Sequence, residues 1–231
     1  MARLPPGSDR PLSAIVLAAG LSRRMGPRNK LLLPVDGVPL VRRSVAVVLG
    51  HPFAEVVVVT GHEAPLVEAA LDGLAVRTVR NPRYEEGQMT SVRAGLEALS
   101  APRTGHIGGD PRTPGPAGAT DATPERGVMV CLADQPALTT EDLGLVAGAF
   151  LARVDCPVLV PTFRGTRGNP IVLGWRSLAS ILSRGGDFGC RQFVAKNADL
   201  VTTFEMPSDH VLTDVDRPED YAALGAPSLP E

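Results

Sequence analysis

The amino-acid sequence predicts an α/β fold of three layers, in which a mostly parallel sheet carries helices on both faces. Short apolar runs alternate along the chain with amphipathic stretches, as expected when each strand is followed by a helix. The run Val56–Thr60 contains only β-branched residues, which is typical of a parallel strand covered on both faces. The chain has 231 residues, of which 44% are apolar and 21% charged, so its composition is that of a globular protein with one good-sized core.

The predicted strands are short runs of apolar residues bounded by turn residues. They span residues 13–18, 56–60, 76–79, 128–133, 157–161, 171–173 and 201–204. The predicted helices are segments in which apolar residues recur every three or four positions. They span residues 39–49, 63–71, 89–99, 140–152, 176–182, 191–196 and 218–224. Thr139 or Thr140 is expected to cap the fourth of these helices, and Pro218 suits the first turn of the last one.

A single domain is expected over residues 13–225, between a flexible N-terminal tail at 1–12 and a C-terminal tail at 226–231. Residues 100–127 interrupt this domain with five prolines, six glycines and a single large aliphatic side chain, Ile107. Such a segment buries too little apolar surface to offset the entropy of ordering it. Because the alternation of strands and helices resumes directly afterwards, we expect a disordered insertion at 100–127 rather than a domain boundary.

The overall charge argues against a nucleic-acid partner. The formal net charge is -2 and the pI is about 6.1, whereas nucleic-acid binders carry a basic excess. Cys131, Cys156 and Cys190 form no disulfide or zinc-binding pattern, which favours reduced thiols in a cytoplasmic protein. The apolar stretch near the N-terminus is too short to span a bilayer, so neither export nor a membrane partner is expected.

The loop after the first predicted strand contains the densest set of functional groups. Ligands of parallel sheets bind at the carboxyl ends of the strands, where this loop begins. Its small residues allow close approach of a ligand to backbone amides, and its hydroxyl and cations suit an anion such as a phosphate. The candidate binding residues are Leu17, Ala18, Ala19, Gly20, Ser22, Arg23, Arg24 and Lys30. The loop matches neither GxxxxGK[ST] nor GxGxxG, which excludes the common P-loop and dinucleotide motifs.

Three aspartates are candidate metal ligands. Asp134 directly follows a fully apolar predicted strand, where a carboxylate either caps the next helix or binds a cation. Asp214 and Asp216 alternate on an extended segment and would share one face of a regular strand. The simpler interpretation is that Asp216 caps the last helix and that Asp214 is solvated.

Two further loops contain candidate ligand contacts. Gly61 follows a buried strand and would leave room for a ligand, while Thr90 and Ser91 lie at the start of a predicted helix, where they cap the helix, bind a ligand or do both. Arg167, Gly168 and Asn169 belong to a basic glycine-containing loop at 164–170, which is either a solvated hairpin or a binding loop for an anionic acceptor.

The order of the motifs along the chain resembles that of the MobA-like NTP transferases, and within them the molybdenum cofactor cytidylyltransferases. The first loop reads LAAGLSRRMGPRNK and is followed by NPRYEEGQMTSV, LADQP, RGNP and DVDRPED. Together these motifs cover nearly the whole chain apart from the first dozen residues and the insertion at 100–127. The resemblance implies the nucleotide-diphospho-sugar transferase fold, which is Rossmann-like.

The resemblance also assigns roles to the candidate residues. It implies that Asp134 and the second aspartate, Asp216, hold Mg2+ between the nucleotide phosphates, with Asp214 kept as the alternative second ligand. Arg23 and Lys30 would bind phosphates and act with Asp134 in catalysis. The base of the nucleotide would lie near the first loop, Thr90 and Ser91. The list of acceptor-binding candidates is Arg167, Gly168 and Asn169. Many relatives have histidine where this chain has Asn169, so any histidine-dependent step is in doubt.

The implied activity is transfer of CMP from CTP to the phosphate of molybdopterin, a phosphorylated pterin, with a molybdenum hydroxylase as the possible client. The choice of CTP over GTP rests on LAAG in place of LAGG. Two alternatives remain. One is an oxidoreductase acting on a quinoid small molecule, since some MobA-like chains are described in that way. The other is a non-catalytic carrier of the cofactor for a hydroxylase.

Overall fold

The computed structural model of the chain describes residues 12–101, 127–178 and 198–225, and it confirms the predicted fold class. An eight-stranded sheet has the order β10-β7-β9-β6-β1-β4-β5, with β8 paired to β7. The strands are β1 (Leu12–Ala18), β4 (Val56–Thr60), β5 (Arg77–Arg80), β6 (Gly127–Leu132), β7 (Val158–Phe163), β8 (Thr166–Arg167), β9 (Ile171–Gly174) and β10 (Val201–Glu205). The sheet is mostly parallel, because only β8 and β9 run antiparallel to their neighbours.

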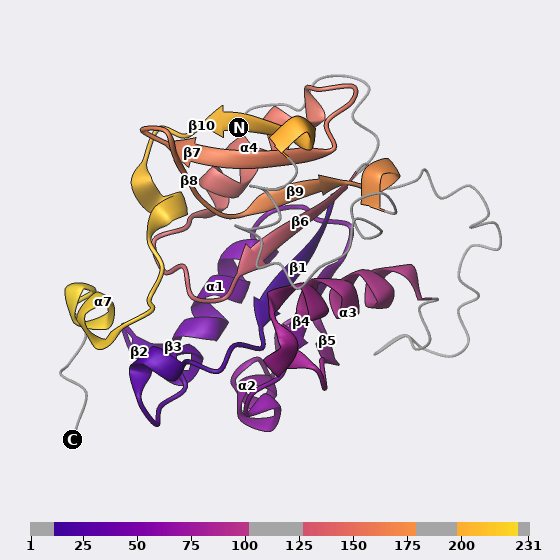
Figure 1. Cartoon of the computed structure of the whole chain (residues 1–231). Coiled ribbons are helices and arrows are strands. Elements are labelled where there is room, and N and C mark those ends of the chain that lie inside the picture. The colour runs from indigo at the N-terminus through magenta and orange to yellow at the C-terminus, as the bar shows by residue number, and fades with distance from the viewer. Residues whose placement is uncertain (1–11, 102–126, 179–197, 226–231) are drawn as a thin grey trace.

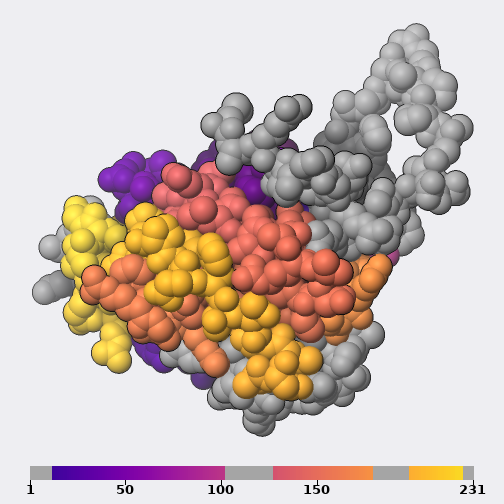
Figure 2. All heavy atoms as spheres, turned by 90° about the horizontal axis from the view of Figure 1, so that it is seen from above, coloured from indigo at the N-terminus to yellow at the C-terminus, as the bar shows by residue number. Residues whose placement is uncertain are grey.

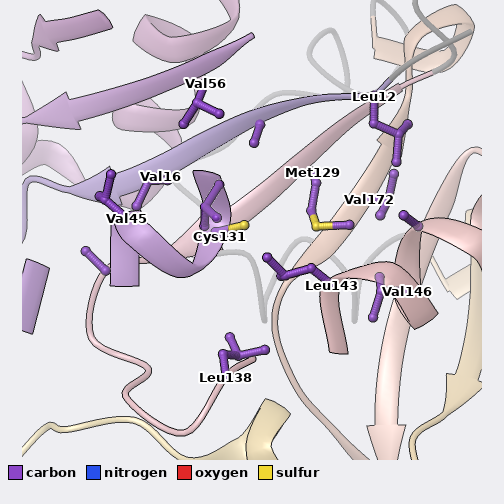
Figure 3. Packing of buried hydrophobic residues seen from close by; sticks show 14 of the residues in the cluster. Leu12, Val16, Val45, Val56, Met129, Cys131, Leu138, Leu143, Val146 and Val172 are labelled. Carbon is purple, nitrogen blue, oxygen red and sulfur yellow. The ribbon is translucent and has the colours of Figure 1, made fainter. Parts of the chain in front are cut away.

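Helices cover both faces of the sheet (Figure 1). Three of them pack on one face, and these are α1 (Leu40–Leu49), α2 (Ala64–Ala70) and α4 (Thr140–Leu151). The long helix α3 (Gln88–Ser100) covers the other face. Alternate residues of β1 explain this arrangement, since Val16 faces the first set of helices and Ile15 faces α3. Figure 3 shows the first of these two cores, in which side chains of β1, β6, α1 and α4 interdigitate.

The close packing of α3 depends on a glycine. A Cβ added at Gly95 would lie 2.7 Å from Ile15 Cγ2, so any side chain there would push the helix away from β1. The start of α3 is thereby held close to the carboxyl end of the sheet.

A small third core lies at the edge of the molecule. The hairpin of β2 (Pro34–Val35) and β3 (Val38–Pro39) packs with the short C-terminal helix α7 (Pro218–Ala223). The Tyr221 hydroxyl, at the centre of this core, donates to the Pro34 carbonyl at 2.5 Å. Seen from above, the C-terminal segment in yellow and gold lies along the orange segment that contains β7, as the β10–β7 pairing requires (Figure 2).

The element boundaries differ from the predicted ones by one or two residues at most positions. The predicted tail at 1–12 ends one residue too late, because Leu12 is buried and pairs with Gly127 in the sheet. The predicted insertion at 100–127 likewise includes Ser100, the last residue of α3, and Gly127, the first of β6. Apart from Ala101, the remainder of both segments and the tail at 226–231 lie outside the described residues.

Two predicted helices lie partly or wholly outside the described residues. Of the one expected at 176–182, the structure describes residues 176–178, which belong to or follow the 3-10 turn Trp175–Ser177, and the one expected at 191–196 is not described. The two-residue strands β2, β3 and β8 were not predicted, because so short a pairing leaves no periodic pattern. None of the helices in the described ranges is long and apolar enough to cross a bilayer.

Candidate active site

A cleft of about 470 Å³ lies at the carboxyl ends of β1 and β6, where the fold class predicts a ligand. It is built from the loop after β1, the start of α3, the loop after β6 and the segment before α7. The lining residues are Leu17, Ala19, Gly20, Leu21, Ser22, Arg23, Arg24, Lys30, Leu31, Tyr84, Glu85, Gly87, Gln88, Ser91, Leu132, Asp134 and Asp216.

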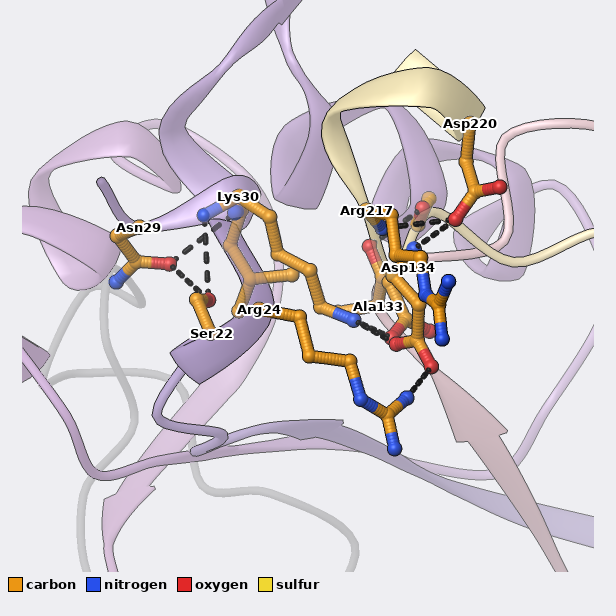
Figure 4. A network of polar contacts seen from close by, with 11 residues as sticks. Ser22, Arg24, Asn29, Lys30, Ala133, Asp134, Arg217 and Asp220 are labelled. Carbon is orange, nitrogen blue, oxygen red and sulfur yellow. Dashed lines mark hydrogen bonds and ion pairs between the residues drawn. The ribbon is translucent and has the colours of Figure 1, made fainter. Parts of the chain in front are cut away.

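One end of the cleft, which we call the ionic end, contains Arg24, Lys30, Asp134 and Asp216. The Lys30 ammonium lies 2.5 Å from Asp134 Oδ2 and 2.8 Å from Asp216 Oδ1, so it bridges the two carboxylates (Figure 4). Arg24 Nη1 contacts the other oxygen of Asp216, Oδ2, at 2.5 Å. Two cations and two anions therefore neutralise one another in the structure.

Backbone contacts bring the two aspartates together although they are far apart in the sequence. The amide of Val215 donates to the carbonyl of Asp134 at 2.9 Å, which joins the loop after β6 to the segment before α7. On the other side of Asp134, the buried Ser44 hydroxyl of α1 donates to the Ala133 carbonyl at 2.9 Å. Asp216 is directed into the cleft, because the first turn of α7 is capped by Asp220, which accepts from the amides of Asp216 and Arg217.

The charges at the ionic end shift the pKa values of Lys30, Asp216 and the neighbouring Asp214. Burial alone would lower the pKa of Lys30, but the charges and hydrogen bonds of Asp134 and Asp216 raise it. Burial opposes ionisation of Asp216 too, yet its contacts with Lys30 and Arg24 lower the pKa of the carboxyl. The pKa of Asp214 is raised by partial burial and by the nearby charges of Asp216 and Asp134. Lys30 and Asp216 are thus both held in their charged forms at neutral pH.

The donor set at the ionic end fits a hard divalent cation. Asp134 Oδ1 is buried and has no hydrogen-bond partner among the described residues, so one carboxylate oxygen is left for a further ligand. Mg2+ commonly takes only one or two protein carboxylates and completes its shell with phosphates and waters. Among the described residues, no group of three or more histidine, cysteine, aspartate or glutamate side chains is arranged so that it could hold a metal ion.

The loop after β1 is closed by its own side chains. Ser22 adopts a left-handed conformation, with φ of 51°, which is uncommon for a residue other than glycine. Its Oγ accepts from the Lys30 amide at 3.2 Å, and Asn29 caps the 3-10 turn Lys30–Leu32 by accepting from the Leu31 amide at 3.1 Å. These bonds direct the Lys30 side chain toward the two aspartates.

The other end of the cleft, which we call the base end, contains Leu17, Tyr84, Ser91 and Leu132. Leu17 and Leu132 form its floor, and Tyr84 lines it from the 3-10 turn before α3. Gly61 lies beside Tyr84: a Cβ added there would be 2.7 Å from Tyr84 Cβ and 2.8 Å from Ala19 Cβ. An apolar surface with an aromatic ring next to a charged end suits a heteroaromatic group that carries phosphates.

Most of the predicted ligand-binding residues lie together in this cleft. They are Leu17, Ala19, Gly20, Ser22, Arg23, Arg24, Lys30, Ser91, Asp134 and Asp216. The Ser22 hydroxyl, expected as a ligand donor, instead holds the loop closed. Ala18 is buried in the core under α1, and Gly61 makes room for Tyr84 rather than for a ligand.

Five other predicted residues do not line the cleft. Thr90 is buried, and its hydroxyl donates to the carbonyls of Gly87 and Arg83, so it ties the first turn of α3 to the segment before it. Asp214 lies outside the lining, two residues before Asp216. Arg167 is exposed on β8, which pairs with β7 in a hairpin. This agrees with the alternative in which the loop at 164–170 is a solvated hairpin. Gly168 and Asn169 donate their amides to the carbonyls of Pro161 and Val211, respectively.

Sequence reasoning missed Tyr84 as a candidate contact. The one sequence feature that could have indicated Tyr84 is its position in the segment NPRYEEGQMTSV. This segment leads into the helix whose first residues were expected to contact the ligand. The contact with Gly61, which lies more than twenty positions earlier, could not be read from either segment alone.

Comparison with known proteins agrees with this geometry. The model of the MobA-like NTP transferase domain matches residues 14–201. Nicotine blue oxidoreductase of Paenarthrobacter nicotinovorans is 28% identical over 92% of this chain and 96% of its own length. The molybdenum cofactor cytidylyltransferase of Escherichia coli is 25% identical, with 91% and 93% of the two chains covered.

Solved structures have the same fold. A nucleotidyl transferase from Methanothermobacter thermautotroptrophicus superposes with a TM-score of 0.70 at 25% identity, covering 93% of this chain and 95% of its own. A Mycobacterium tuberculosis protein, Rv0371c, in complex with manganese has a TM-score of 0.64 at 24% identity, with 93% and 97% covered. The domain match extends over most of the chain, and the chain therefore belongs to the family of MobA-like NTP transferases, that is, to the nucleotidyltransferases.

Proposed function

We propose that this protein transfers CMP from CTP to the phosphate of molybdopterin, with Mg2+ as cofactor and pyrophosphate as the second product. The observation that carries the proposal is the bridging position of Lys30 between two carboxylates at the charged end of a cleft. The nearly full-length relationship to the Escherichia coli cytidylyltransferase supports the choice of CTP and of a pterin acceptor.

In this reaction a phosphate oxygen of the acceptor attacks the α-phosphorus of CTP in line with the bond to the β-phosphate, which breaks. No covalent intermediate with the protein is needed, since positioning and charge neutralisation supply the catalysis. Asp134 and Asp216 would hold Mg2+, for which Asp214 is the alternative second ligand. The metal supplies positive charge that orients the α-phosphate and stabilises the negative charge developing on it.

The cations of the first loop act on the leaving group. Arg23, Arg24 and Lys30 would bind the β- and γ-phosphates and hold the pyrophosphate as it departs. Arg24 is 65% exposed at its side chain, so it can turn from Asp216 to a phosphate without breaking packing. The amides of Ala19 and Gly20 would complete the phosphate site, where the exposed Gly20 has open space around its Cα.

The acceptor would bind outside the ionic end and the base end of the cleft. We place it against the hairpin that contains Arg167, Gly168 and Asn169, next to the segment leading to Asp216, because the Asn169 amide is bonded to Val211 of that segment. Asn169 cannot titrate, so it would orient the acceptor and take no proton from it. A molybdenum hydroxylase would be the client, and the reaction would take place in the cytoplasm, where CTP is made.

A second candidate function is reduction of a quinoid small molecule, because nicotine blue oxidoreductase is similar over nearly the whole chain. A carrier without catalysis is the third candidate, and the intact pair of aspartates argues against it. The deciding experiment incubates the protein with Mg2+, molybdopterin and each NTP in turn, and in parallel with NADPH and a quinone. Our proposal expects a CMP adduct by mass and one pyrophosphate per adduct. NADPH oxidation without any NTP-derived adduct would support the oxidoreductase instead.

A further inference from the structure

Asn81, a buried residue at the end of β5, makes a set of hydrogen bonds that fixes how it is oriented. Its Oδ1 accepts from the Arg83 amide at 2.9 Å, and its Nδ2 donates to Thr90 Oγ1 at 2.8 Å and to Ser91 Oγ at 2.9 Å. The Arg83 N–H excludes the flipped amide, since the flip would set two donors against each other. Both hydrogens of the amide are therefore directed at the two hydroxyls.

The two hydroxyls that receive these hydrogens differ in what they can still do. Thr90 Oγ1 accepts from Asn81 and donates its own proton to the Gly87 or Arg83 carbonyl, at 2.8 and 2.9 Å. Ser91 Oγ only accepts, and within the described ranges its side chain makes no other hydrogen bond. Ser91 is 4% exposed and lines the base end of the cleft, so its proton is left for a bound ligand.

We infer that Asn81 is a positioning residue that makes the Ser91 hydroxyl a hydrogen-bond donor to the base of the bound nucleotide. The base end is then selective for bases that place an acceptor, such as O2 or N3 of a pyrimidine, opposite Ser91. This inference rests on the proposed nucleotide substrate. Asn81 itself touches no ligand, because it does not line the cleft and both hydrogens of its amide are used within the protein.

The consequence is that Asn81→Asp reverses the polarity of the base end with almost no change of shape. A carboxylate can only accept, so the Ser91 proton would turn toward residue 81 and its lone pairs toward the ligand. A base acceptor would then face an acceptor, while bases presenting an N–H at that point would gain a partner.

The experiment measures the affinity of CTP, GTP and inorganic tripolyphosphate in the presence of Mn2+, by calorimetry, for the wild type and variants. Tripolyphosphate reports on the ionic end alone, so the ratio of CTP to tripolyphosphate affinity isolates the contribution of the base end. Asn81→Asp and Ser91→Ala are each expected to lower this ratio about tenfold, the range of one buried hydrogen bond. Asn81→Asp should also reverse the order of affinity for CTP and GTP. Ser91→Ala should leave that order unchanged.

Thr90→Val is the matched control, since it removes the other partner of Asn81 and is expected to lower thermal stability but leave the ratio unchanged. If Asn81→Asp does not fold, Asn81→Leu removes the donor without a charge and is expected to lower the ratio as well. An unchanged ratio in the Asn81 variants, or equal losses of CTP and tripolyphosphate affinity, would overturn the inference. If the wild type binds tripolyphosphate and no NTP binds more tightly than tripolyphosphate does, the proposed function itself is overturned.

Discussion

The two ends of the cleft are prepared for a ligand in different ways. At the ionic end Lys30 and Arg24 are paired with Asp134 and Asp216, so each charge already has a partner within the protein. At the base end Tyr84 is held by packing against Gly61, and Ser91 is held by Asn81, with its proton unused. Ligand binding must therefore exchange partners at the ionic end, whereas it only fills a preformed surface at the base end.

This difference implies that phosphates and metal depend on each other for binding. A cation can use Asp134 Oδ1, which has no hydrogen-bond partner among the described residues, but at Asp216 it must compete with the Lys30 ammonium and with Arg24, each of which contacts one carboxylate oxygen. A triphosphate offers that ammonium a new partner. Metal and nucleotide should therefore each bind weakly alone and tightly together.

The largest expected effect follows from Lys30→Met. Nucleotidyl transfer should fall by about a hundredfold or more, because a cation that stabilises the transition state is lost. Mn2+ without nucleotide should nevertheless bind more tightly than to the wild type, as two carboxylates lose their competing ammonium. Titration followed by electron paramagnetic resonance measures this. Arg43→Gln, which breaks a surface pair with Asp36, is the control, and unchanged Mn2+ binding in Lys30→Met would contradict the exchange.

Tyr84→Ala tests the base end with the next largest effect. Stacking of a base on an aromatic side chain is worth about 1–3 kcal/mol, so CTP affinity should fall by about ten- to a hundredfold. Tripolyphosphate affinity, measured in the same calorimetric series, should stay at the wild-type value because no phosphate contact is changed. Equal losses for both ligands would show that the two ends are not separable.

Gly61→Ala should have a smaller effect at the same end. The new methyl group would lie 2.7 Å from Tyr84 Cβ and so displace the ring rather than remove it. We expect CTP affinity to fall by a few-fold and tripolyphosphate affinity to be unchanged. Gly148→Ala on α4, where a Cβ meets nothing within 4 Å, is the matched control and should bind both ligands normally.

The smallest effect on either end is expected from Asp142, which lies outside the cleft. Burial opposes its ionisation, but hydrogen bonds from Thr139 and His210 lower its pKa below the usual value. A lowered pKa contributes stability that is present above the unfolded-state pKa, about 3.9, and is lost as the pH falls through the folded-state value. Asp142→Asn should therefore unfold at a lower temperature than the wild type at pH 7. The expected loss in free energy of unfolding is about 1 kcal/mol, the usual cost of a lost helix cap.

The melting temperatures of Asp142→Asn and the wild type should converge as the pH falls through the lowered folded-state pKa of Asp142, and the CTP affinity at pH 7 should be the same for both. A difference in melting temperature that is independent of pH would assign the loss to packing instead of charge. Loss of CTP affinity in this variant would show that stability alone changes binding, and would weaken the interpretation of the cleft variants.

The ionic end of the cleft could be anticipated from the sequence more readily than the base end, for a physical reason. Arg24, Lys30 and Asp134 lie in loops at the carboxyl ends of strands, where local sequence alone points to a ligand. The place of Asp216 in the cleft depends on the backbone bond from Val215 to Asp134, which joins segments about eighty residues apart and cannot be read from either segment alone.

The base end depends on packing between loops that the sequence does not relate to one another. The sequence predicts space for a ligand at Gly61, but Tyr84 lies against this residue. Thr90 and Ser91 are adjacent hydroxyl residues at the start of α3, and only their different hydrogen bonds distinguish the buried Thr90 from the cleft residue Ser91. The fold itself was predictable because the strands and helices have clear periodicity, whereas β2, β3 and β8 are too short to show any.

The most direct test of the account follows the α-phosphorus of the nucleotide. The wild type is incubated with Mg2+, molybdopterin and CTP labelled at either the α- or the γ-phosphorus, beside Asp134→Asn. We predict that the wild type transfers the α-label to the pterin product and releases the γ-label in pyrophosphate. Asp134→Asn should do neither. An α-label that stays in CTP or in free CMP, or full transfer by Asp134→Asn, would contradict the account.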